Sequence, residues 1–283
     1  MRVLPASKPS ADHGALAATA KPRVAVLMPA YNASETIKLS IASLVNNTYP
    51  CDIFIIDDGS AVPLELSPDE STRVQLIRLE RNVGVARALN TGLKTILSQH
   101  YEFVARMDAD DICYPDRIAQ EVRFLDDHPE IAAVGGWARH LYEAGGAQLF
   151  VERTPQSPEL IRKALNYNSA IIHSTFMIRT DVLRAVGLYS VDYPVAEDYE
   201  LFRRITERYK MANIPRFLLD RIISKNGVSV TRRRNQLADR FRIQLRYFRS
   251  GELSAWIGIA KTAVLFAVPT SLILKIKEYR FAT

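Results

Sequence analysis

Short apolar runs alternate with helix-like segments through the first half of the chain. Between the runs, apolar residues recur at helical spacing over residues 35–46 and 85–99, and again from Pro115 onward. The runs, each bounded by polar or turn residues as buried strands are, cover residues 23–28, 51–57, 74–79, 103–107 and 131–134. This alternation is typical of an α/β fold with a mostly parallel, Rossmann-like sheet flanked by helices.

The second half of the chain is less regular. A polar, glycine-containing stretch over residues 143–156 indicates a hairpin or a loop, and residues 174–178 form a candidate strand. The strongest helical pattern covers residues 197–209, where the apolar positions fall on one face. That face is expected to turn Leu201 and Phe202 inward.

Polar segments follow three of the predicted strands, at the point where each strand ends. They cover residues 29–32, 57–60 and 108–111. In a mostly parallel sheet, ligands bind outside the carboxyl ends of the strands. The sequence therefore places a candidate site at this edge of the sheet.

The sharpest of these features is the acidic run Asp108-Ala109-Asp110-Asp111. Three carboxylates in four residues repel one another, so a bound cation would stabilise them. Alternate residues of an extended segment share a face, which lets Asp108 and Asp110 converge. Hard oxygen ligands suit Mg²⁺ or Mn²⁺. A solvated acidic turn that caps the following helix is the alternative.

Two weaker features lie upstream of the acidic run. Asp57-Asp58-Gly59 is a common turn sequence, although one of its carboxylates could accept hydrogen bonds from a base or a ribose. Gly84 lies at a predicted helix start, where backbone amides and Arg87 could hold a phosphate. A helix entry with a tight turn explains Gly84 equally well.

Glu197 and Asp198 open the predicted helix of the second half. Acidic residues at a helix N-terminus are favoured by the helix dipole, so capping is their default explanation. Either carboxylate would also serve as a general base if it faced a cleft.

Composition fits one α/β enzyme domain with an appendage. The 283 residues are 48% apolar and 24% charged, ordinary values for a soluble enzyme with a large core. The two cysteines, Cys51 and Cys113, match neither a disulfide framework nor metal-ligand spacing, which fits a reducing cytosol. Residues 1–21 are small and polar without the apolar core of a signal peptide, and are expected to be a disordered lead-in.

The net charge of +6 is concentrated in the C-terminal part. Residues 225–283 carry twelve Lys and Arg against three acids, a net of +9, so the remainder carries about −3. A basic surplus of this kind favours contact with phosphates, either lipid headgroups or nucleic acid, and a solvated basic face is the alternative.

Residues 231–283 are expected to form a basic amphipathic helix and an apolar C-terminal segment. Apolar residues of the predicted helix fall on one face: Leu237, Phe241, Leu245 and Phe248. The apolar stretch that follows, residues 253–277, is interrupted by Lys261 and Pro269. This pattern predicts peripheral contact with a membrane surface. Packing against the body or against a partner is the alternative.

Seven strings of the sequence resemble glycosyltransferase family 2 in kind and in order: VLMPAYNASETI, IIDDGS, RNVGVARALNTGL, ARMDADD, DRIAQEVRFLDDHPEIAAVGG, HSTFMIRTDVLRAVGLY and AEDYELFRRI. Each string alone is moderately specific, but the series extends from about residue 23 to residue 229. The resemblance implies a GT-A fold over residues 22–230, in which a nucleotide-binding half joins an acceptor-binding half. It also implies transfer of a sugar with inversion of its anomeric centre.

Carried onto this sequence, the resemblance implies a nucleotide pocket. The residues implied are Pro29, Ala30, Tyr31 and Asn32 as its lining, Asp57 or Asp58 at the base or ribose, and Asn82, Gly84 and Arg87 beside the nucleotide or diphosphate. Asp108 and Asp110 are similar to the family's DxD pair. Asp110 is the expected direct metal ligand, Asp108 the expected ribose or metal contact, and Ala109 lies between them at the nucleotide.

The resemblance also implies the general base. Asp198 matches the base of the family's ED motif and would take the proton from the acceptor hydroxyl. Glu197 would orient Asp198, or be the base itself. His173 would touch the donor or acceptor sugar, and a hydrogen-bonded structural histidine is an equally good explanation.

The implied partners are a nucleotide-sugar donor, commonly a UDP-sugar, with Mn²⁺ or Mg²⁺, and a saccharide or lipid-linked saccharide acceptor. The expected location is the cytoplasm, at the cytoplasmic face of the inner membrane, with no nucleic acid partner. A sugar nucleotidylyltransferase is an alternative, but its Gly-rich basic first loop is replaced here by PAYNASE. A non-catalytic, membrane-docked scaffold is another, and the intact carboxylates argue against it.

Overall fold

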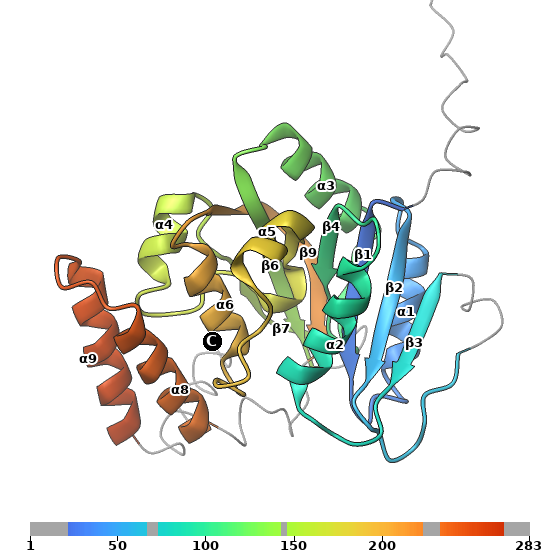
Figure 1. Cartoon of the computed structure of the whole chain (residues 1–283), viewed down its shortest axis with the longest axis horizontal. Helices are drawn as coiled ribbons and strands as arrows, with labels where there is room; N and C mark the ends of the chain where they lie inside the picture. Colours follow the sequence, from blue (N-terminus) through green and yellow to red (C-terminus); the bar gives the residue numbers. More distant parts are fainter. Residues whose placement is uncertain (1–21, 67–72, 143–145, 223–232, 269–283) are drawn as a thin grey trace, which may run out of the picture.

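A nine-stranded sheet runs through the residues that the computed structural model describes, 22–66, 73–142, 146–222 and 233–268 (Figure 1). Four parallel strands form one half of the sheet, in the order β3 (Val74–Arg78), β2 (Cys51–Asp57), β1 (Val24–Ala30) and β4 (Phe103–Arg106). The chain runs outward from β1 to β3 and then returns to β4, on the other side of β1. The carboxyl ends of β1 and β4 thus form a topological switch point, where α/β sheets bind ligands.

The other half of the sheet is mixed in direction. β8 (Met177–Arg179) pairs antiparallel with both β4 and β6 (Ile131–Leu141). β9 (Lys210–Ile222) runs parallel to β6, while β5 (Ile112–Cys113) is antiparallel to β9 and β7 (Gln148–Glu152) is antiparallel to β6. This arrangement brings the end of β9 beside the loop that follows β4.

Helices cover both faces of the sheet, and the strand pattern explains why. Along β1, Ala25 and Leu27 face one hydrophobic cluster, while Val24 and Val26 face the other. The first cluster is covered by α2 (Val85–Leu97), α4 (Pro158–Ala164), α5 (Thr180–Val186), α6 (Glu197–Ile205) and α8 (Arg233–Arg246). The second is covered by α1 (Ile37–Val45) and α3 (Arg117–Asp127). The expected α/β sheet flanked by helices is confirmed.

The structure corrects the predicted elements mainly in the second half. The predicted strand at 131–134 extends to Leu141, and β9 was not predicted at all. Pro215 inside β9 breaks the ladder pattern, and the register between β6 and β9 shifts beside it. Residues 173–175 form a 3₁₀ turn (η2) before the short β8, and α6 ends at Ile205 rather than 209. The hairpin expected within 143–156 is present as β6–β7.

The C-terminal helices α8 and α9 (Leu253–Ala267) pack against each other, at the end of the molecule opposite β3 (Figure 1). α8 is joined to the body by the hydrogen bond from Arg203 to the Tyr247 carbonyl, at 2.9 Å. The predicted apolar face of α8 is wrong in part, because Leu245 is half-exposed while Ile243 is buried in the core. Among the described residues, no helix is both long and apolar enough to cross a membrane.

Candidate functional site

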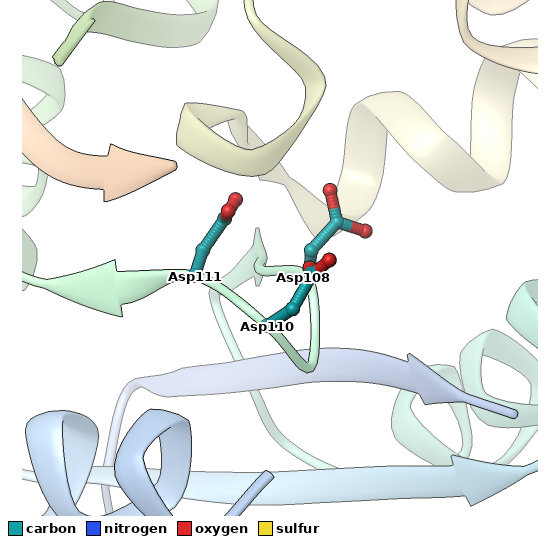
Figure 2. Close-up of side chains that lie close together, drawn as sticks. All are labelled: Asp108, Asp110 and Asp111. Carbon is teal, nitrogen blue, oxygen red and sulfur yellow. The ribbon is translucent and has the colours of Figure 1, made fainter. Parts of the chain in front are cut away.

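The acidic run forms a loop at the carboxyl end of β4. The chain leaves β4 at Arg106 and turns through Asp108–Asp111 before β5 pairs it with β9. One ligand oxygen from each of Asp108, Asp110 and Asp111 lies within 4.8 Å of the others. The three carboxylates point away from β1 and β2, and that of Asp111 points toward the end of β9 (Figure 2). Ala109 between them is buried and keeps the turn compact.

Two arginines partner the acidic loop. Arg106, buried at the end of β4, makes a close ion pair with Asp108. Arg221 on β9 lies 3.9 Å from Asp108 and 3.8 Å from Asp111. The Ser174 hydroxyl also donates to Asp108, at 3.2 Å. Asp108 is therefore held from three sides, whereas Asp110 has no such partner among the described contacts and reaches solvent.

The three carboxyl groups differ in pKa because their surroundings differ. Burial alone would raise the pKa of Asp108, but the Arg106 charge and hydrogen bond lower it below the usual range. Asp110 reaches solvent, but the surrounding protein partly desolvates its carboxyl; this desolvation, and then the charge of Asp108, raise its pKa. The same two effects raise the pKa of Asp111 to about 7. The nearby arginines therefore do not fully offset the negative charge of Asp110 and Asp111.

This donor set fits a hard divalent cation. Carboxylate oxygens are the ligands that Mg²⁺ and Mn²⁺ prefer, and a cation would favour the ionised forms of Asp110 and Asp111. Four buried polar atoms of the cluster have no hydrogen-bond partner: Arg106 Nε, Arg106 Nη1, Asp111 Oδ2 and Arg221 Nε. Buried polar groups are rarely left in this state without a ligand. The loop is therefore a candidate site for a cation together with an anionic ligand.

A second acidic pair, Glu197 and Asp198, lies at the N-terminus of α6. Burial and the neighbouring Asp198 charge raise the pKa of Glu197 to about 8. Burial also raises the pKa of Asp198, although the Tyr199 amide donates to its Oδ1 at 2.7 Å. The charge of Arg106 lowers both pKa values, and the charge of Asp108 raises that of Glu197. A buried carboxylate with a raised pKa beside a site is suited to general-base chemistry.

His173, next to Ser174 on η2, contacts Tyr189. The His173 ring nitrogen Nε2 and the Tyr189 hydroxyl are 2.8 Å apart. Burial, and then the charge of Arg106, hold the pKa of His173 well below its usual value, so the imidazole is neutral. Asn90 on α2 exchanges two hydrogen bonds with the Tyr189 backbone, each 2.9 Å. His173 is thus a fixed, neutral hydrogen-bonding group.

The predicted base or ribose residues hold their own loop together. Asp57 is fully buried, pairs with Arg78 at 2.7 Å and accepts the Ser60 amide at 2.9 Å. Asp58 accepts the amides of Val83 and Gly84 at 2.8 and 2.9 Å. Gly59 in this turn has φ +69°, and a Cβ there would lie 2.4 Å from the Arg81 backbone. The turn therefore positions the start of α2, and a nucleotide contact by either aspartate stays a prediction.

Replacing Asp58 by asparagine is expected to lower the free energy of unfolding by about 2–3 kcal/mol. A neutral amide can accept only one of the two backbone N–H bonds, and its own NH₂ would face the other donor. Urea denaturation measures the effect. Asp116→Asn is the matched control, because Asp116 is exposed and makes no side-chain capping bond. Equal stability of both variants would contradict this role for Asp58.

The first loop and the start of α2 hold the remaining predicted nucleotide residues. Pro29 and Ala30 end β1, and Tyr31 is half-exposed just beyond it. Asn32, at φ 52°, donates its amide to the Ser60 hydroxyl at 2.8 Å, which joins the first loop to the Asp57–Ser60 turn. The loops after β1 and β2 are therefore brought together, as expected for strand ends at one edge.

Asn82, Gly84 and Arg87 lie along the entry to α2. Gly84 has φ +89°, which favours glycine, and a Cβ there would meet no atom within 4 Å. A cleft of about 490 Å³ runs along the outer side of α2, lined among others by Arg81, Arg87 and Lys94. None of the three loop aspartates lines it. The cleft is basic, and the predicted diphosphate contact of Arg87 stays a prediction.

Four residues of the site were missed by sequence reasoning: Arg106, Arg221, Ser174 and Tyr189. Arg106 gave a usable signal, because it lies two residues before Asp108 at the end of a strand. Ser174 follows His173 in a string already noted. Arg221 gave none, since its strand was not predicted and its contacts cross more than a hundred residues of sequence.

Comparisons with known proteins give the family of the chain. The model of the family described as "Glycosyl transferase family 2" matches residues 25–187. An uncharacterized glycosyltransferase of Haemophilus influenzae is 32% identical over 222 residues, 74% of this chain and 68% of that protein. The amylovoran biosynthesis glycosyltransferase AmsE of Erwinia amylovora is 30% identical over 204 residues, 69% of this chain and 74% of AmsE.

Solved structures share the fold at low identity. S. aureus TarS, solved as a fragment with UDP-GlcNAc, superposes with a TM-score of 0.59 at 18% identity, over 79% of this chain and 66% of that one. This chain covers 39% of the longer TarS structure. The mannosyltransferase PcManGT of Pyrobaculum calidifontis, solved with GDP-Man and Mn²⁺, has a TM-score of 0.59 at 18% identity, over 94% of this chain and 82% of that one.

Proposed function

Because the chain belongs to glycosyltransferase family 2 and has a GT-A fold, we propose that it transfers a sugar from a nucleoside diphosphate, preferentially a UDP-sugar, to an acceptor hydroxyl with inversion. The observation that carries this proposal is the presence of two acidic groups, the loop Asp108–Asp111 and the pair Glu197 and Asp198 at the start of α6. The charge of Arg106 lowers the pKa values of Asp108, Glu197 and Asp198 alike. Transfer to a hydroxyl requires that the charge of the leaving diphosphate is neutralised and that a proton is removed from the acceptor. The acidic loop is suited to the first task through a bound cation, and the pair Glu197 and Asp198 is suited to the second.

Asp110, with Asp108, would hold Mn²⁺ or Mg²⁺, and Asp111 completes the acidic loop. When bound, the cation stabilises the charge that develops on the departing diphosphate. Arg106 keeps Asp108 ionised through its ion pair, so Asp108 stays available as a ribose or metal contact. Arg221 faces the same loop and offers a positive charge beside it. A cation-bound PcManGT structure with this fold supports the assignment.

Asp198 would take the proton from the acceptor hydroxyl. Burial raises its pKa, which makes its ionised form a better proton acceptor than an ordinary aspartate. Glu197, with a pKa raised to about 8, is predominantly protonated at pH 7 and therefore is suited to orienting Asp198 rather than replacing it. Neutral His173, fixed by Tyr189, is placed to hydrogen-bond a sugar hydroxyl.

The nucleotide would lie against the loops after β1 and β2. Pro29, Ala30, Tyr31 and Asn32 are proposed as the lining of its pocket, with Asp57 or Asp58 at the base or ribose. Asn82, Gly84, Arg87 and Ala109 are proposed beside the diphosphate. Exposed Tyr31 and the ordered Asn32 turn at the end of β1 support this placement, because they flank the switch point.

The acceptor is proposed to be a saccharide of a surface polysaccharide, carried on a lipid at the cytoplasmic face of the inner membrane. The similarity to AmsE, named for amylovoran biosynthesis, supports a polysaccharide. The basic C-terminal region, residues 231–283, supports a peripheral membrane contact.

Release of nucleoside diphosphate from a panel of UDP-, GDP- and dTDP-sugars tests the proposed reaction. We expect release from one class of donor in Mn²⁺, stimulated by added saccharide acceptor. Full release in EDTA, or no binding of any donor, would contradict the proposal. Incorporation of label from a nucleoside triphosphate into a nucleotide sugar would favour a nucleotidylyltransferase instead.

A further inference from the structure

Helix α9 packs on the protein through a face of small residues. Ser254, Ala255, Gly258 and Thr262 are its buried positions. The backbone approach is close, since a Cβ at Gly258 would lie 1.9 Å from the carbonyl oxygen of Asn166. The Asn166 side chain also donates to the Ser254 hydroxyl, at 2.7 Å. α9 is therefore fixed to the body along one side, with a defined side facing outward.

The outward side of α9 is apolar from end to end. Its residues, which we call the outer face, are Leu253, Trp256, Ile257, Ala260, Ala263, Val264 and Ala267, all exposed. The exposed fractions reach 75% at Leu253, 54% at Trp256 and 61% at Val264. Lys261 is the one charged residue of α9, and by helical spacing it lies at the edge of this face. A contiguous apolar stripe of this length on a surface helix indicates an interaction site.

Trp256 is ordered within this face. Its indole N–H donates to the Ser250 carbonyl at 3.0 Å, and its ring meets Phe248 edge-to-face with centroids 4.8 Å apart. Leu245 on α8 is half-exposed in the turn of helix before Phe248. The apolar surface thus continues from α9 onto the end of α8. Tryptophan with its polar atom satisfied and its ring exposed is typical of side chains at a membrane–water interface.

The positive charge near the outer face favours an anionic lipid surface over a second copy of the chain as its partner. Arg234, Arg242, Arg246 and Arg249 are exposed on α8 and the turn after it. Residues 225–283 as a whole carry a net charge of +9. A symmetric pairing of two copies through α9 would bring two such charges together, whereas an anionic bilayer would be attracted.

We propose that the outer face of α9 inserts its side chains into the interfacial region of an anionic lipid bilayer, with the arginines of α8 against the headgroups. The proposal rests on the proposed function only in that a lipid-linked acceptor would be reached from this surface. Because α9 is fixed to the body along its small-residue side, it lies in the plane of the membrane and contacts lipid through one side. This assigns the contact to one side of α9, whereas the sequence pattern placed it on residues 231–283 as a whole.

The two tryptophans of the chain make the proposal directly measurable. In a Trp137→Phe background, Trp256 is the only tryptophan and reports on α9. On addition of vesicles of phosphatidylcholine and phosphatidylglycerol, we expect a blue shift of its emission and co-sedimentation of the protein. Binding should weaken at least tenfold in pure phosphatidylcholine, because the attraction to the arginines is lost, and should fall as salt rises.

Ile257→Glu, made in this background, is expected to weaken vesicle binding at least tenfold. A charge in the middle of the apolar stripe opposes its insertion into lipid. Leu39→Glu is the matched control, because Leu39 is an equally exposed apolar residue on α1. Circular dichroism confirms that both variants fold. Equal binding of Ile257→Glu and Leu39→Glu to anionic vesicles would overturn the proposal. So would a Trp137→Phe parent protein that does not bind these vesicles.

Two further measurements distinguish membrane contact by α9 from dimer formation and from the proposed sugar transfer. A dimer in sedimentation equilibrium that Ile257→Glu dissociates, without any vesicle binding, would assign the outer face to a second copy. Metal-dependent release of nucleoside diphosphate, measured without vesicles, should be unchanged in Ile257→Glu. If release is absent in the parent protein while vesicle binding is present, the proposed reaction fails and the docking surface stands.

Discussion

Substitution of Asp110 by asparagine is expected to lower the rate of sugar transfer by about 1000-fold or more. Asp110 is the carboxylate of the acidic loop without a protein cation as its own partner, and burial and Asp108 raise its pKa. A cation is therefore the group that would neutralise it. Losing this ligand weakens a stabilisation of the leaving diphosphate worth several kcal/mol, and each 1.4 kcal/mol is about a factor of ten.

Release of nucleoside diphosphate, measured at saturating donor, tests this effect. Mn²⁺ is varied over about 1–10 mM, because a weakened site binds metal again when its concentration is raised. The variant should need more Mn²⁺ than the wild type for half-maximal rate. Its thermal stability without metal should not fall, because repulsion between Asp108 and Asp110 is relieved. Asp116→Asn again serves as the matched control. Wild-type rate and wild-type metal dependence in Asp110→Asn would contradict the assignment of a metal site to this loop.

Substitution of Asp198 by asparagine is expected to lower the maximal rate by about 100- to 10,000-fold without weakening donor binding. This is the usual contribution of a positioned general base. Asp198 works in its ionised form, and its pKa is raised by burial. The wild-type rate should therefore fall as the pH is lowered through this raised pKa, at a higher pH than an ordinary aspartate would give. The pH dependence of kcat/KM measures the position of this limb.

The comparison with Glu197→Gln separates the two carboxyl groups. Because Glu197 is predominantly protonated at neutral pH, its amide should retain a larger share of the rate than Asp198→Asn does. The acid limb should stay at its wild-type position in Glu197→Gln, since a protonated Glu197 carboxyl adds no charge beside Asp198. A larger loss in Glu197→Gln than in Asp198→Asn would assign the base to Glu197.

The sheet could be predicted from sequence where strands are buried and regular. β1, β2, β3 and β4 each read as a short apolar run between polar segments, and each is present close to its predicted bounds. β9 was not predicted, because Pro215 and its polar neighbours break the alternation of apolar and polar residues on which strand predictions depend. Its place in the sheet comes instead from long-range pairing with β6, which no local pattern encodes.

The site was predictable in its residue types and less so in their contacts. Asp108 and Asp110 converge as predicted, but through a turn at residues 109 and 110 rather than an extended segment, and the turn brings Asp111 in as well. The ion pair of Arg106 with Asp108 and the approach of Arg221 depend on strand pairing across the sheet. The sequence predicted either a turn or a ligand contact at Asp58, but not that both its oxygens accept backbone amides at the start of α2.

The exposed surface of α8 and α9 also could be predicted only in part from the sequence. The apolar spacing of Leu237, Phe241, Leu245 and Phe248 is real, but α8 packs both on the core, through Ile243, and against α9, while Leu245 is exposed. Periodicity reports how many apolar faces a helix can offer, and tertiary packing decides which of them is covered.

Calorimetric titration of nucleotide sugar into the protein, with Mn²⁺ and then with EDTA, tests the central claim most directly. The account predicts that one class of donor binds wild-type protein and Asp198→Asn alike in Mn²⁺. It predicts that this binding is lost or strongly weakened both in EDTA and in Asp110→Asn. Equally tight donor binding by the wild type in EDTA and by Asp110→Asn in Mn²⁺ would contradict metal-dependent transfer at the acidic loop.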